Sequence, residues 1–171
     1  MTKEKDFNKP MMRIFISYFG AHKKLFLIDM SCAFLIAAID VAFPLVSRYA
    51  MYELLPGKLY RVFFIVMAIT LAAFLLRSVF YYIITYLGHR FGILVEADIR
   101  EDLYRHFQLL DFDFYDKNRT GKLMNRLTGD LFEITELAHH GPEDLLISIA
   151  TITGALIVMF TVEWRLALMV L

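Results

Sequence analysis

The stretch LLISIATITGALIVMFTV, residues 145–162, is eighteen residues long and contains no charged side chain. As an α-helix with 1.5 Å of rise per residue it would be about 27 Å long, close to the thickness of the hydrocarbon core of a bilayer. An uncharged apolar segment of this length is typical of a transmembrane helix. The segment therefore predicts a membrane protein.

Other long apolar segments flank this one. Residues 25–54 predict a first span, and a second begins at residue 60 after a turn that contains Pro56 and Gly57. After residue 162 the chain turns, and residues 164–171 predict the start of a truncated fourth span. Because the sequence stops inside that apolar run, we expect the chain to be a fragment of a longer protein.

The basic residues are distributed unevenly among the loops. Lys and Arg number six before the first span and seven in residues 88–130, against two around the Pro56 turn and one, Arg165, after the third span. Since cytosolic loops are enriched in Lys and Arg, we expect the amino terminus and residues 88–143 to be cytosolic and residues 55–60 to be external. The expected location is the cell membrane, with several passes.

Two regions near the predicted spans are amphipathic. Residues 10–20 carry apolar side chains at helical spacing, which predicts an elbow helix in the headgroup region, although the first span could instead start early. The long cytosolic loop repeats apolar residues at steps of three and four, which predicts two helical arms of about 33 Å each. The repeats are Val95, Ile99, Leu103 and Phe107 in one arm, and Leu123, Leu127, Leu131, Ile134 and Leu137 in the other.

Arms of equal length predict a hairpin. The outgoing arm extends the second span, so that residues 60–110 form one unit, and the returning arm joins the third span in residues 122–162. Residues 111–121 then form the tip. Phe114 and Tyr115 at this tip either anchor a partner protein or fold back between the arms, and the pattern leaves both alternatives open.

Charged residues are rare within the spans, and such residues usually face each other or a cavity. Asp29 and Arg77 are each predicted to lie about 6 Å from the cytosolic side, so we expect them to form a pair. Asp40 is predicted to lie nearer the middle of the membrane, where it would line a cavity.

Histidines and carboxylates cluster before the third span, and this cluster could bind a metal ion. We expect Gly141 and Pro142 to kink its helix, however, and no third ligand group is near in the sequence. We therefore expect no metal site, and interpret the cluster as a polar neck at the membrane boundary. Its members are His139, His140, Glu143 and Asp144.

The loop sequence GHRFGILVEADIREDLYRHFQLLDFDFYDKNRTGKLMNRLTGDL, residues 88–131, closely resembles the first intracellular loop of ABC exporters with the type I exporter fold, also called type IV. The run ELAHHGPEDL resembles a bacterial subset of that family. Matching positions in the loop include Gly88, His89, Arg100, Leu103, Tyr104, His106, Leu110, Phe114, Asp116, Thr120, Gly121, Leu123, Arg126, Leu127 and Asp130. Tyr115 stands where many members have Phe.

The resemblance implies an all-α membrane fold, in which long transmembrane helices extend into the cytosol as a hairpin with a coupling helix at its tip. It implies the amino-terminal part of a permease/ATP-binding protein that forms part of a translocation pathway. The implied partners are a nucleotide-binding domain that uses ATP and Mg²⁺, a second half-transporter that is identical or different, lipid, and an unknown substrate. The implied coupling residues are Phe114, Tyr115, Asp116, Lys117, Asn118 and Arg119.

The sequence lacks the pattern G-x-x-x-x-G-K-[ST], so we expect no ATPase activity, catalytic residue or cofactor-binding residue on this chain. Its formal net charge of zero argues against a nucleic-acid partner. Two alternatives to a transporter remain. One is a membrane-anchored signalling or scaffold protein that docks a cytosolic partner, and the other is a non-functional truncated fragment.

Overall fold

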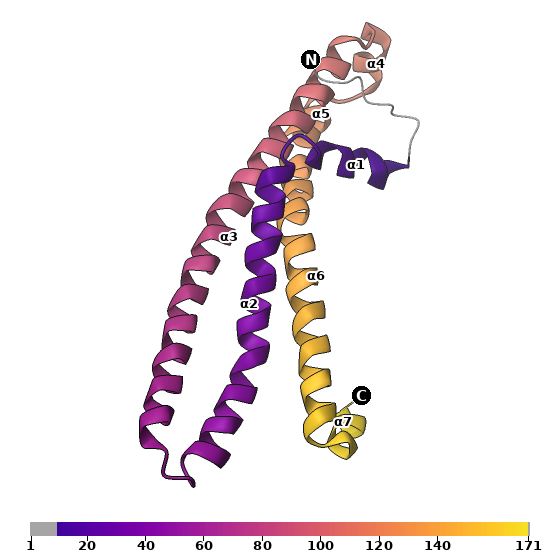
Figure 1. Ribbon diagram of the computed structural model, residues 1–171. Helices are drawn as coiled ribbons and strands as arrows, with labels where there is room; N and C mark the ends of the chain where they lie inside the picture. Colours follow the sequence, from indigo (N-terminus) through magenta and orange to yellow (C-terminus); the bar gives the residue numbers. More distant parts are fainter. Residues whose placement is uncertain (1–9, 171) are drawn as a thin grey trace. The chain divides into compact units, whose positions relative to one another are not determined.

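The computed structural model describes residues 10–170, and within them the regular structure is entirely helical (Figure 1). Among these described residues, three helical segments are long and apolar enough to cross a membrane: Lys23–Leu54, Tyr60–Gln108 and Thr120–Val162. The predicted all-α membrane fold is therefore confirmed. Lys3, Lys5 and Lys9 of the charge count, and Leu171 of the predicted fourth span, lie outside the described residues.

The first span comprises α2 (Lys23–Tyr49), which contains Pro44, followed by the π-helix η1 (Ala50–Leu54). After a turn, α3 (Tyr60–Gln108) runs without interruption for 49 residues. The remaining helices are α1 (Met11–Phe19), α4 (Phe112–Lys117), α5 (Thr120–Leu127), α6 (Gly129–Val162) and α7 (Trp164–Val170).

The returning arm, predicted as one helix over residues 122–162, is interrupted at Thr128. The backbone N–H and the hydroxyl of Thr128 both donate to the carbonyl of Met124, at 3.1 and 3.0 Å. Thr128, whose side chain bonds to the preceding turn, and Gly129 after it both have a low helix propensity. The arm is therefore formed by α5 and α6, with one turn residue between them.

The chain divides into two compact units. The hairpin unit consists of the residues up to Ile28 and of Tyr86–Pro142, so it contains α1, the end of α3, α4, α5 and the start of α6. The span unit consists of Asp29–Thr85 and the residues from Glu143 onward.

In the hairpin unit, α1 packs against α3. Tyr18, Phe91 and Val95 are buried together, and the rings of Phe19 and Phe91 meet edge to face with centroids 5.0 Å apart. The Tyr18 hydroxyl donates a hydrogen bond to the Asp102 carboxylate at 3.0 Å. Burial and then this carboxylate raise the pKa of Tyr18 above its ordinary value. The elbow helix is thus fixed to the hairpin by an aromatic cluster and a buried hydroxyl.

Glycines bring α3 and α6 into close contact in the same unit. A Cβ atom added to Gly92 would lie 3.1 Å from Cγ2 of Thr135, and one added to Gly88 would overlap the His139 ring. Helices approach closely where small residues meet. The predicted apolar stripe is therefore wrong in part: Leu123, Leu127 and Leu131 are buried, but Thr135 and Ala138 are buried in place of the exposed Ile134 and Leu137.

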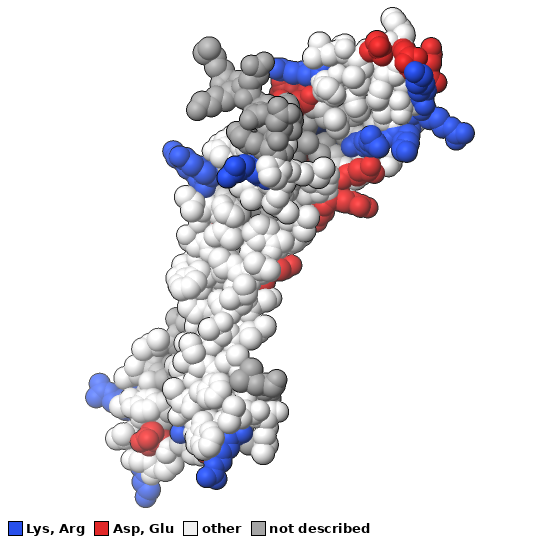
Figure 2. Space-filling model, turned by 90° about the vertical axis from the view of Figure 1, so that its right-hand side faces the viewer, with Lys and Arg blue, Asp and Glu red and all other residues white. Residues whose placement is uncertain are grey.

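The span unit has a small core and a large apolar exterior. Cys32, Ala33 and Ile36 of α2 pack with Ile84 of α3, and Leu146 and Ile147 of α6 cover this cluster. The most apolar windows of the second and third spans contain no buried residue. On the face in Figure 2, this unit is mostly uncharged, with charged side chains gathered near the end where α2 leads to α3. Its exterior is suited to lipid.

Candidate functional sites

The hairpin tip is the short helix α4, which lies between α3 and α5 (Figure 1). The Asp111 carboxylate caps its amino terminus by accepting a hydrogen bond from the backbone N–H of Phe114 at 3.1 Å. At the other end, the side-chain amide of Asn118 donates to the Phe114 carbonyl at 2.8 Å. Asp113 and Lys117 form an ion pair along its surface. Local polar contacts thus define a compact helix of six residues.

The tip aromatics divide into two kinds. Phe114 and Tyr115 are half-buried, and the Tyr115 hydroxyl donates to the Phe107 carbonyl near the end of α3. This contact favours the alternative in which Tyr115 folds back. Phe112 is 89% exposed and Leu109 is 84% exposed, so they form the apolar surface that the tip presents. Asp116, Lys117 and Arg119 are exposed around it.

Sequence reasoning did not include Phe112 and Leu109 among the coupling residues. A signal was present, because Phe112 directly follows the capping residue Asp111 and so begins α4. An aromatic residue at the first position of so short a helix has few intrahelical neighbours to cover it. The surface made by Leu109 and Phe112 is called the tip patch below.

Within the span unit, Arg77 pairs with Asp40. Nε and Nη2 of Arg77 donate to the two carboxylate oxygens of Asp40 at 2.7 and 2.9 Å, a bidentate arrangement. The guanidinium also lies over the ring of Tyr81, 4.8 Å from its centroid. The prediction that Arg77 pairs with Asp29 is therefore wrong.

The error has a geometric cause. The helical segment from Lys23 to Leu54 has 32 residues and is about 48 Å long. It is therefore longer than the thickness of the bilayer core, which was used to predict the depths of Asp29 and Arg77. Counted from the turn between the spans, Asp40 and Arg77 lie at about 21 and 25 Å, at nearly the same height. Asp29 is buried elsewhere in the unit, with its carboxylate within 4.8 Å of that of Glu143.

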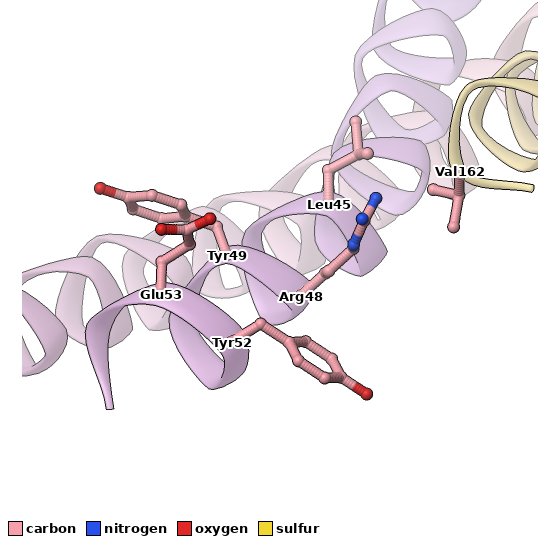
Figure 3. A pocket seen from close by; sticks show the side chains of 6 residues that line it. All are labelled: Leu45, Arg48, Tyr49, Tyr52, Glu53 and Val162. Carbon is pink, nitrogen blue, oxygen red and sulfur yellow. The ribbon is translucent and has the colours of Figure 1, made fainter. Parts of the chain in front are cut away.

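A cavity of about 610 Å³ opens at the end of α2, in the span unit. Leu45, Arg48 and Tyr49 line it from α2, Tyr52 and Glu53 from η1, and Val162 from the end of α6 (Figure 3). In η1 the N–H of Leu55 bonds to the carbonyl of Ala50, which is the wider spacing of a π-helix. The cavity offers a cation, an anion and two phenol rings to a bound molecule. Sequence reasoning did not identify it.

Within the described residues, three long apolar helices, a half-buried Asp40–Arg77 pair between two of them and a helical hairpin with a capped tip define this chain as a multi-pass membrane protein of the all-α class. The model of the ABC transporter transmembrane region matches residues 26–171. The chain therefore belongs to the ABC transporter transmembrane family, and the resemblance found in the loop sequence is confirmed.

Relatives in this family include bacterial proteins. The uncharacterized ABC transporter ATP-binding protein YwjA of Bacillus subtilis is 44% identical over 93% of this chain, and the putative multidrug export ATP-binding/permease protein YgaD of the same organism is 26% identical over 92%. The chain spans 28% of the length of each. The human oligopeptide transporter ABCB9 is 33% identical over 41% of the chain, which spans 9% of it.

Proposed function

We propose that this chain supplies the first membrane spans and one coupling element of an ATP-driven exporter. The observation that carries the proposal is the tip patch: a rigid, capped helix presents an exposed Phe and Leu at the end of two helical arms. An exposed apolar cluster with a charged surround is typical of a protein docking surface. The family match and the multidrug export name of one relative support the exporter assignment.

In the proposed orientation, the spans cross the cell membrane, and the amino terminus and the hairpin unit lie in the cytosol. The distribution of Lys and Arg supports it, because residues 88–130 carry seven basic side chains, whereas residues 55–61, which form the turn before α3 and the first residues of that helix, carry two. In this orientation α4 reaches a cytosolic partner. Charged residues of the arms, such as the Glu101 and Arg105 pair, are then solvated.

The proposed partner of the tip is a nucleotide-binding domain, which would bind ATP and Mg²⁺ with its own residues. Its closure on ATP would push on α4, and the arms would carry this movement to the spans as rigid bodies. A second half-transporter, identical or different, would complete the translocation pathway. The substrate is not specified by these residues, and the cavity at Arg48 and Glu53 is a candidate contact for it.

The test is a pair of variants of the assembled transporter in reconstituted vesicles. Phe112→Ala removes the most exposed aromatic side chain of α4, and we expect it to cost about 2 kcal/mol of docking energy if it is a hot spot. Transport per ATP hydrolysed should then fall. Phe132→Ala is the matched control, since Phe132 is a 56% exposed aromatic on α6, away from the tip. Unchanged coupling in the Phe112 variant would contradict the proposal.

A scaffold that docks a cytosolic partner without transport would use the same tip patch. Membership of the transporter family argues against it. The same vesicle experiment separates the two functions, since a scaffold would show no substrate movement dependent on ATP.

A further inference from the structure

Three histidines from two helices meet in the hairpin unit. His89 projects from α3, and His139 and His140 from α6. Each offers a ring nitrogen, and these three nitrogens lie within 4.8 Å of one another. The ring of His89 meets those of His139 and His140 edge to face, with centroids 4.9 and 5.9 Å away. The ligand that the sequence around His139 lacked is therefore supplied by another helix.

The surrounding residues hold this cluster in place. A Cβ atom added to Gly88 would lie 1.8 Å from Cε1 of His139, so the imidazole occupies space that exists only because Gly88 has no side chain. His139 is 3% exposed, and its ring is fixed in this slot between the helices. Glu136 lies one turn before His140, and its carboxylate is 3.4 Å from Nε2 of that ring. Such carboxylates orient metal-bound histidines and set their tautomer.

We propose that His89, His139 and His140 bind a Zn²⁺ ion that ties α3 to α6. Three imidazoles are a donor set that Zn²⁺ uses in proteins, with Zn–N bonds of about 2.0–2.1 Å and a fourth position for water or another ligand. Tetrahedral bonds of that length place the nitrogens about 3.4 Å apart. The three ring nitrogens are at most 4.8 Å apart in the structure, so they need to approach one another by little more than 1 Å to bind the ion.

The exposure of the ligands provides the route for metal entry and for this closure. His89 and His140 are exposed while His139 is buried, so the ion reaches one fixed ligand and two that can adjust by side-chain rotation. The bound ion would add three coordination bonds to a contact otherwise made by Gly88, Gly92 and small residues of α6. Zn²⁺ would therefore stabilise the junction of the two arms.

The test measures Zn²⁺ binding by the full chain in detergent, by competition with a chromogenic chelator, and binding of Co²⁺ by its visible absorption. We expect one Zn²⁺ per chain and the intense Co²⁺ bands of a tetrahedral site. His89→Asn and His140→Asn should each weaken Zn²⁺ binding by at least about 100-fold, and Glu136→Gln by about 10-fold. His106→Asn, at an exposed histidine of α3 outside the cluster, is the matched control and should leave the affinity unchanged.

The two ligand variants alter exposed side chains, so circular dichroism should confirm that their helices persist. Thermal unfolding gives a second readout: Zn²⁺ should raise the Tm of the parent chain and of His106→Asn, but not that of His89→Asn. Equal affinity in the parent and in the His89 and His140 variants would overturn the proposal, as would a chain that binds no Zn²⁺. Neither result bears on the coupling function, because the assay contains no nucleotide-binding domain.

Discussion

The hairpin unit and the span unit contain helices of similar kind, yet they distribute apolar side chains differently. In the hairpin unit Val95 is fully buried, and the Glu101–Arg105 ion pair lies on the outside of the same helix. In the span unit, Leu71 and Leu75 of that helix are each 64% exposed. One helix, α3, is therefore amphipathic in one unit and apolar all round in the other, and this difference indicates water around the first and lipid around the second.

The hairpin unit and the span unit also differ in the environment of their charged side chains. The Glu101 and Arg105 pair of the hairpin unit is exposed, with side-chain accessibilities of 62% and 66%. Asp40 and Arg77 of the span unit form a bidentate contact in a region with few other charges. Water can solvate an exposed group that loses its partner, but lipid cannot. The difference between the two units can therefore be tested by replacing one residue of an ion pair in each unit and measuring the change in unfolding free energy.

The largest effect is expected from Arg77→Leu, which leaves the Asp40 carboxylate unpaired within the membrane and should cost about 3–5 kcal/mol of unfolding free energy. Glu101→Gln in the hairpin unit should cost only about 0.3–0.5 kcal/mol. Both can be measured by denaturant titration of the chain in bicelles. The double change Asp40→Arg with Arg77→Asp should recover much of the loss. Similar losses for the two single variants would contradict the assignment of lipid and water to the two units.

A smaller effect is expected at the helix contact of the hairpin unit. Gly88→Ala places a methyl group on the His139 ring and should destabilise the chain by about 1–3 kcal/mol. Gly121→Ala is the matched control, because nothing lies within 4 Å of its added Cβ, and Ala in a helix is favoured over Gly by up to about 1 kcal/mol. Thermal unfolding in detergent measures both. A neutral Gly88 variant would show that α3 and α6 do not approach this closely.

An effect smaller than that of Gly88→Ala is expected at the elbow helix. Tyr18→Phe removes the hydrogen bond to Asp102 and should cost about 1 kcal/mol. The folded-state pKa of Tyr18 is raised above the ordinary value of 10.0, so its stabilisation is complete below pH 10.0 and is lost as the pH rises further. Unfolding followed between neutral pH and above pH 10.0 should show this loss in the parent chain. An identical pH profile in Tyr18→Phe would contradict it.

Hydropathy and helical period predicted the number of spans, the elbow helix segment and the position of the hairpin. These features depend on many residues at once, so single exceptions do not change them. The pairing of Asp40 with Arg77 depends on the lengths of the two helices. The prediction assumed a fixed bilayer thickness and therefore assigned Arg77 the wrong partner. The tip patch and the histidine cluster depended on which side chains meet between helices. No spacing within α3 or α6 alone could show that His89 lies beside His139.

The central claim is that α4 docks on a nucleotide-binding domain while the turn between α2 and α3 lies on the other side of the membrane. Its most direct test is crosslinking in the assembled transporter from single cysteines introduced as Lys117→Cys or Lys58→Cys, in a Cys32→Ser background. Lys117 is an exposed residue of α4, and Lys58 lies in that turn. We predict a crosslink to the nucleotide-binding domain from position 117 and none from position 58. A crosslink from position 58, or none from position 117, would contradict the account.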